Sequence, residues 1–143
     1  MILKSTNDIH GFSLIEIMVA FAILSVSFLA IMTSFPFGVS INKEAENNTI
    51  AANLAQKKIE EVISLEYANI AVGEIESKHR LASGASDYLY NYQRETTANY
   101  LDSNLTSTTT DTGLKKISTT VYYTNSISKS EKSYNTTTIV SQK

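Results

Sequence analysis

Cysteine and tryptophan are absent from this 143-residue chain, which has one proline and five glycines. Without cysteine there is no disulfide, thiolate metal site, cysteine nucleophile or iron–sulfur ligation. So little proline and glycine excludes a collagenous or linker-rich chain. The formal net charge is −2 at pH 7, so the composition shows no overall basic footprint for duplex nucleic acid. The length and the 43% of hydrophobic residues favour a single packed domain.

Candidate catalytic and metal-binding residues are few. His79 is the only histidine after residue 11, and no serine lies in a G-x-S-x-G motif that would present it as a nucleophile. We therefore interpret His79 as a solvated surface residue. The Asp, Glu and His residues do not cluster at the spacing of a metal site. The sequence predicts no enzymatic activity, no cofactor and no metal.

The strongest feature is a run of 26 residues without charge, Ile17 to Asn42. At a rise of about 1.5 Å per residue, a helix of this length crosses a hydrocarbon core of about 30 Å. We interpret residues 12–42 as a membrane span, too long for the apolar core of a removed secretory signal. The excess positive charge lies before the run, at the α-amine and Lys4, which favours a cytoplasmic N-terminus.

The next segment, residues 43–71, has the pattern of an amphipathic helix. The residues on its apolar arc are Ala51, Leu54, Ala55, Ile59, Val62 and Leu65. Pro36 interrupts the preceding run, but a proline inside a helix kinks it without necessarily ending it. We therefore expect one helix from Phe12 to about residue 70.

The remaining part, residues 87–143, is rich in strand-forming residues. Strands are predicted at 87–97, 114–124 and 133–141, with a loop at 100–113 and a hairpin connection at 125–132. A small antiparallel sheet with one wet face needs the amphipathic helix to cover the other face, so the predicted fold class is α+β. Within the first strand, Tyr88, Tyr90 and Tyr92 form a stripe with period two. We interpret the stripe as packing beneath the helix, with stacking on single-stranded DNA as the alternative.

A glutamate stands at the head of the apolar run, five residues after a glycine, in Gly11-Phe12-Ser13-Leu14-Ile15-Glu16. An ionised carboxylate in hydrocarbon is costly, so a glutamate at this place indicates a functional site that needs a partner. The alternative is an interfacial residue whose carboxylate reaches the water.

The segment GFSLIEIMVAFAILS resembles the N-terminal cleavage and methylation segment of type IV pilins and of type II secretion pseudopilins. The resemblance implies that residues 1–11 are a leader, which a membrane-embedded prepilin peptidase removes between Gly11 and Phe12. It also implies methylation of the new α-amine of Phe12, and it places Glu16 at the fifth mature position. In stacked subunits, the amine of one chain can face the carboxylate of another, so that neither charge is left unpaired.

A second resemblance concerns the type of subunit. Asn53 to Glu61 and the last two predicted strands are similar to minor pilins, especially the small pseudopilin of the tip complex and pilus-modification proteins. Two features depart from major pilins, because Pro36 comes about one turn late and a disulfide loop cannot form without cysteine. The resemblance implies a minor subunit with an extracytoplasmic domain at residues 43–143, in a tip or initiation complex.

The implied partners are other pilin or pseudopilin subunits, the prepilin peptidase and methyltransferase, the inner-membrane assembly platform and, before assembly, membrane lipid. The implied location is the cytoplasmic membrane, followed by a periplasmic or cell-surface filament. Secretion, motility and DNA-uptake machines share the identifying segment. Three alternatives stay open: a major pilin, an unprocessed single-pass anchored protein, and a DNA-binding minor pilin of a competence system. The cations available for nucleic acid are Arg80, Arg94, Lys115, Lys116, Lys129 and Lys132.

Overall fold

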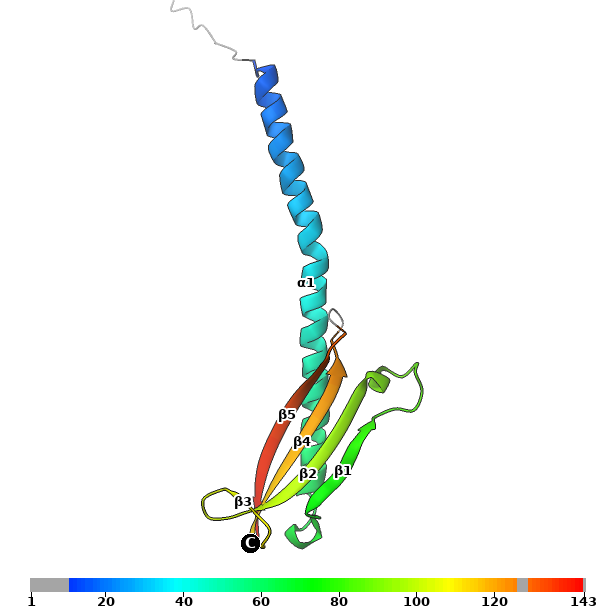
Figure 1. Ribbon diagram of the computed structural model, residues 1–143. Coiled ribbons are helices and arrows are strands. Elements are labelled where there is room, and N and C mark those ends of the chain that lie inside the picture. The colour runs from blue at the N-terminus through cyan, green and yellow to red at the C-terminus, as the bar shows by residue number, and fades with distance from the viewer. Residues whose placement is uncertain (1–10, 126–128, 143) are drawn as a thin grey trace, which may run out of the picture. The chain divides into compact units, whose positions relative to one another are not determined.

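The computed structural model describes residues 11–125 and 129–142. Its elements in chain order are α1 (Leu14–Ile63), the 3₁₀ turn η1 (Tyr67–Asn69), β1 (Gly73–Arg80), the 3₁₀ turn η2 (Tyr88–Asn91), β2 (Tyr92–Leu101), β3 (Ser107–Thr108), β4 (Leu114–Thr124) and β5 (Glu131–Ser141) (Figure 1). The chain divides into two compact units between Val39 and Ser40. The long helix α1 therefore contributes its first part, to Val39, to one unit and its remainder to the other. The predicted α+β class is confirmed.

The second unit contains a five-stranded antiparallel sheet with strand order β1-β2-β4-β5, in which the short β3 pairs with β2 (Figure 1). Strands β4 and β5 pair without interruption along their whole length. The pairing of β1 with β2 shifts register twice, on either side of Glu76. No strand is expected from the sequence at residues 73–80, because the charged segment GEIESKHR lacks an apolar alternation. Residues 73–80 form a strand because they pair with β2, a contact that the sequence pattern does not reveal.

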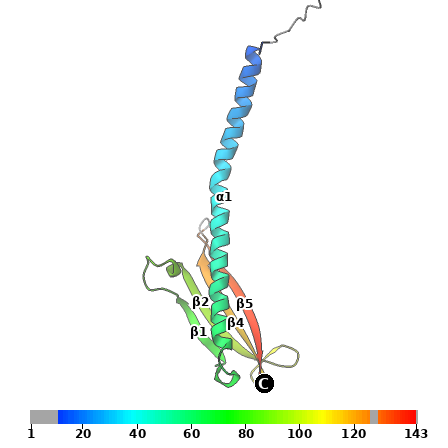
Figure 2. The ribbon, with the colours of Figure 1, turned by 180° about the vertical axis from the view of Figure 1, so that it is seen from behind.

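The part of α1 that belongs to the second unit packs along one face of the sheet (Figure 2). The predicted apolar arc is confirmed at four buried residues, Ala51, Ala55, Ile59 and Val62. Leu65 is exposed, however, and the predicted helix end near residue 70 is wrong because α1 ends at Ile63. The small alanine side chains allow a close approach of helix and sheet, and their burial contributes to the hydrophobic stabilisation of the fold.

After α1 ends, a buried lysine on β4 binds the segment that follows the helix. The side chain of Lys115 on β4 is almost fully buried, and its ammonium donates hydrogen bonds to the carbonyl oxygens of Tyr67 and Ile70, each at 2.8 Å. The ammonium also lies 4.2 Å from the centre of the Tyr67 ring. The Tyr67 hydroxyl donates to Asp111 at 2.6 Å. The carbonyls of Tyr67 and Ile70 thus bond to Lys115, where a continuing helix would bond them to the backbone N–H groups four residues further on. For this reason the sequence pattern alone predicts a longer helix than α1.

The tyrosine stripe is only partly confirmed. Tyr92 is buried and its ring centre lies 6.2 Å from that of Tyr123 beneath the helix. Tyr88 and Tyr90 lie in the 3₁₀ turn η2, where Tyr88 is exposed and Tyr90 stacks against the Arg80 guanidinium at 4.2 Å. The predicted strand start at residue 87 is therefore wrong. The Asp87 carboxylate accepts the backbone N–H of Leu89 at 2.8 Å and begins a turn instead.

A polar layer separates two apolar clusters between helix and sheet, one around Val121 and one around Ile117. Within the layer, Glu76 accepts two hydrogen bonds from Arg94, at 2.8 and 2.9 Å, and one from Thr96 at 3.1 Å. Burial raises the pKa of Glu76, but hydrogen bonding and charge from Arg94, with smaller contributions from Lys58 and Thr96, lower it below its ordinary value of 4.5 overall. The carboxylate is thus held ionised inside the fold.

This layer predicts a stability that is lost in acid. Because the pKa of Glu76 is lower in the folded chain than in the unfolded one, the stabilisation is present above pH 4.5 and decreases as the pH falls through the folded-state value. We expect Glu76→Gln to lower the free energy of unfolding by about 1.5–3 kcal/mol at pH 7 and to flatten its dependence on acid pH. Denaturant unfolding of the full chain in detergent, followed at several pH values, tests this. If the free energy of unfolding of the variant falls in acid as steeply as that of the wild type, other carboxylates are responsible for the loss of stability.

Candidate functional site

The three residues before α1 are exposed and lie outside regular structure. A side chain added at Gly11 would meet no atom within 4 Å in the described part of the chain, so the fold itself does not require glycine there. Phe12 is 79% exposed, which is unusual for an aromatic side chain. Gly11 and Phe12, on either side of the predicted cleavage position, are thus both exposed in the described part of the chain.

The helix begins with a local pattern that the sequence reasoning missed. The Ser13 carbonyl accepts hydrogen bonds from the backbone N–H groups of Glu16 at 3.0 Å and Ile17 at 3.2 Å. Ser13 is therefore the N-cap residue of α1. Ser13-Leu14-Ile15-Glu16 therefore fits the capping-box pattern of serine followed three residues later by glutamate. Glu16 lies in the first helical turn, where a negative charge interacts favourably with the helix dipole. The predicted site residues Gly11, Phe12 and Glu16 accordingly occupy one short stretch at the head of the helix.

Within residues 11–125 and 129–142, the apolar half of α1 is exposed along its whole length. Every residue from Leu14 to Val39 is exposed, and α1 contains a stretch long and apolar enough to cross a membrane. The four hydroxyl side chains of this half donate to backbone carbonyls of the preceding turn, as in Ser25 to Phe21 at 2.7 Å and Ser34 to Ala30 at 2.8 Å. Such internal hydrogen bonds let polar side chains enter lipid without an unpaired group. The surface is thus suited to lipid or to other apolar helices.

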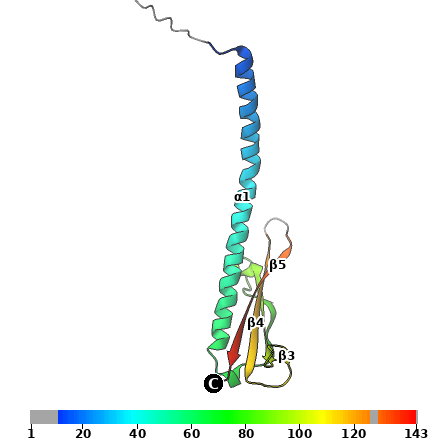
Figure 3. The same cartoon turned by 90° about the vertical axis from the view of Figure 1, so that its left-hand side faces the viewer.

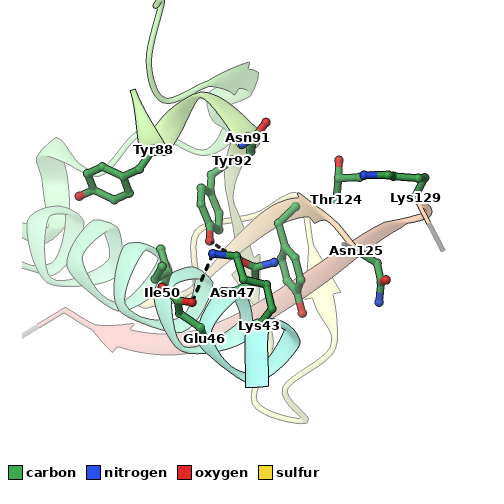
Figure 4. Close-up of a pocket in the computed structure, with 11 residues that line it drawn as sticks. Lys43, Glu46, Asn47, Ile50, Tyr88, Asn91, Tyr92, Thr124, Asn125 and Lys129 are labelled. Atoms are coloured by element: carbon green, nitrogen blue, oxygen red, sulfur yellow. Dashed lines mark hydrogen bonds and ion pairs between the residues drawn. The ribbon is translucent and has the colours of Figure 1, made fainter. Parts of the chain in front are cut away.

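The second unit has a half-open cleft of about 510 Å³. Figure 4 shows Tyr88 and Tyr92 on one side of it and Lys43 with Glu46 on the other. The Tyr92 hydroxyl donates to Asn47 at 3.2 Å, and Lys43 pairs with Glu46 at 3.4 Å. The polar groups along its helix side therefore already interact with one another.

Four of the six cations considered for nucleic acid are engaged inside the second unit. Arg94 pairs with Glu76, Lys115 is buried against carbonyl oxygens, and Lys132 pairs with Glu44 at 2.6 Å. Arg80 stacks on the Tyr90 ring and donates to the Tyr90 carbonyl at 3.2 Å. These contacts reduce the positive charge that the fold can offer to a phosphate backbone.

The catalytic candidate His79 has side-chain contacts with residues close to it in the sequence. His79 is half-exposed, with Nδ1 2.8 Å from the Ser77 carbonyl and Nε2 3.4 Å from Glu76. Across residues 11–125 and 129–142, no group of three His, Asp or Glu side chains is placed to hold a metal ion.

Comparison with known proteins identifies the N-terminal segment. Residues 6–32 match the prokaryotic N-terminal methylation motif, a stretch that includes Gly11, Phe12 and Glu16 together with the first part of the exposed apolar helix. No curated protein and no solved structure matches the chain. This motif, together with the long apolar N-terminal helix and the antiparallel sheet unit, supports a protein of the type IV pilin and pseudopilin type.

Proposed function

We propose that this chain is a minor structural subunit of a type IV pilus or a type II secretion pseudopilus, acting in a complex that initiates the filament. The observation that carries the proposal is the exposed apolar half of α1 directly after Gly11-Phe12, within the matched methylation motif. Because the described residues leave this apolar surface exposed, it needs lipid first and other subunits later. The protein therefore acts by assembly and not by catalysis.

The proposed sequence of events uses the residues at the head of α1. Prepilin peptidase cleaves between Gly11 and Phe12, and the new α-amine is methylated without losing its positive charge. During assembly, this amine meets the Glu16 carboxylate of a neighbouring subunit, and the two charges neutralise each other in an apolar surrounding. The apolar helix half then exchanges contacts with lipid for contacts with other helices, which pack closely where side chains are small, as at Ala20, Ala22 and Ala30.

The minor role is supported by the resemblance at Asn53 to Glu61, by the late Pro36 and by the absence of cysteine. We expect this chain to be far less abundant than the main shaft subunit, since a tip complex is needed once per filament. Quantitative mass spectrometry of purified filaments measures this ratio. If the chain is the most abundant shaft subunit, the major-pilin alternative replaces the minor role.

Deletion provides a second measurement on the same proposal. A subunit that acts at initiation reduces the number of filaments more than their length when it is lost. Counting and measuring filaments by electron microscopy in deleted and complemented cells separates the two effects. Shorter filaments at unchanged number would contradict a role at initiation.

A further inference from the structure

We propose that the free edge of β5 binds an extended, mostly uncharged strand from a different subunit, which runs antiparallel to β5 and adds to the sheet. In the described part of the chain, β5 pairs with β4 alone. The strand lies at the edge of the sheet (Figure 3). An edge strand presents unpaired backbone donors and acceptors that can template another strand. This inference rests on the proposed function, because it assigns a contact within the heteromeric assembly.

The hydrogen bonds at the two ends of the β4–β5 ladder show which groups of β5 are free. The Asn125 N–H donates to the Ser130 carbonyl at 2.9 Å, and the Gln142 N–H donates to the Gly113 carbonyl at 2.8 Å. Because hydrogen-bonded pairs alternate along an antiparallel ladder without bulges, the even-numbered residues of β5 bond to β4. The odd-numbered residues then direct their N–H and C=O groups to the open edge. These are Glu131, Ser133, Asn135, Thr137, Ile139 and Ser141.

The two edges of the sheet differ in how well they are protected against added strands. The β1 edge carries charges at Glu74, Glu76, Lys78 and Arg80, and its register shifts twice. Charged side chains and bulges are the features by which proteins protect an edge. On β5, the nine residues from Ser133 to Ser141 include no charge, proline or glycine, and the pairing with β4 is regular. β5 is thus the edge on which a regular strand fits.

A second copy of this chain fits poorly on β5. Glu44 of α1 pairs with Lys132 at the start of β5, while Val62 of α1 lies in the cluster that Val140 contacts near its end. The helix and β5 therefore run in the same direction. Two copies joined antiparallel through their β5 strands would have their Ser40 residues at opposite ends of the joined sheet, so their helices would run in opposite directions. Copies shifted sideways in the same orientation would place the irregular β1 against β5, and copies related by a two-fold axis along the strands would pair β5 with β5 in parallel, the less stable pairing. A regular antiparallel strand of another subunit avoids these problems.

The first test is residue-resolved hydrogen exchange, comparing the full chain in detergent with the same chain in assembled filaments. We expect the amides of Ser133, Asn135, Thr137 and Ile139 to exchange about 100-fold more slowly in the filament, while the amides of β1 that face its open edge stay unchanged. Fast exchange of these β5 amides in filaments that contain the chain would overturn the inference and leave the proposed function intact. Concentration-dependent protection in detergent, without other subunits, would show that copies pair and would also overturn it.

The second test removes one outward N–H. Thr137→Pro deletes a donor at the open edge and keeps the bonds of the even-numbered residues to β4, and prolines are tolerated at such edge positions. Thr137→Val keeps the N–H and removes only the hydroxyl, so it is the matched control. We expect incorporation into filaments to fall about tenfold for Thr137→Pro and to be unchanged for Thr137→Val. Ile139→Pro repeats the test at a second outward N–H. Normal incorporation of both folded proline variants would overturn the inference, whereas absence of even the wild-type chain from filaments would overturn the proposed function.

Discussion

Replacing Gly11 by valine is expected to leave the protein uncleaved in the membrane. A protease must hold the peptide bond before Phe12 in a narrow geometry, and a branched side chain at residue 11 obstructs the approach on the side where glycine offers none. A misplacement of about 1 Å at a reacting bond costs about 100-fold in rate, so the full-length form should accumulate. Mass spectrometry of the N-terminus in cells with an active prepilin peptidase measures the ratio of the two forms.

In the structure, Gly11→Val changes the cleavage position without disturbing the packing around it. No atom of the described chain lies within 4 Å of a side chain added at Gly11, so the substitution disturbs no contact of the fold. Gly38→Val is the matched control, because Gly38 lies in the apolar half of α1, away from the cleavage position, and also has no neighbour within 4 Å. We expect normal cleavage of the control. Retention of Met1 in the wild-type protein, under the same conditions, would remove the basis for a leader peptide.

Replacing Glu16 by valine is expected to preserve membrane insertion and abolish assembly. The substitution makes the helix more apolar, so insertion is favoured. By the proposed pairing, however, the methylated amine of the neighbouring subunit loses its counter-charge in the filament, and an unpaired buried charge costs roughly 3–5 kcal/mol. Incorporation should therefore fall by about 100-fold or more. Fractionation of membranes and purified filaments, followed by quantification of this chain in each, separates the two effects.

A glutamine at position 16 distinguishes charge pairing from helix capping. Ser13 and Glu16 fit a capping box, and glutamine serves in that pattern as well as glutamate does. Glu16→Gln thus keeps the local cap of α1 and removes only the negative charge. If pairing matters, this variant fails to assemble as valine does. If it assembles normally while Glu16→Val fails, the role of Glu16 is to begin the helix, and the proposed contact with a neighbour's amine is wrong.

Local patterns predicted the elements whose hydrogen bonds are local or regular. The helical periodicity of residues 43–63 placed Ala51, Ala55 and Ile59 on the buried face, and the alternation in β4 placed Ile117 and Val121 opposite them. Each pattern shows which residues of a helix or strand share one face. It can therefore be recognised without knowing which element packs against that face. The segments that failed are those whose conformation depends on distant groups. The helix end depends on Lys115, and β1 depends on pairing with β2.

The sequence by itself determined the character of the N-terminal segment. Gly11, Phe12, Glu16 and the uncharged run that follows form a linear pattern, since a cleavage motif or a membrane span is by nature a continuous stretch of chain. Only the tertiary structure decided which polar residues of the second unit pair within the fold, as for Arg94 and Lys115, and which strands form the edges of the sheet. The physical reason is that strand order, edge exposure and ion pairing join residues distant in the chain. The periodicity of residues along the sequence does not show which distant residues pair.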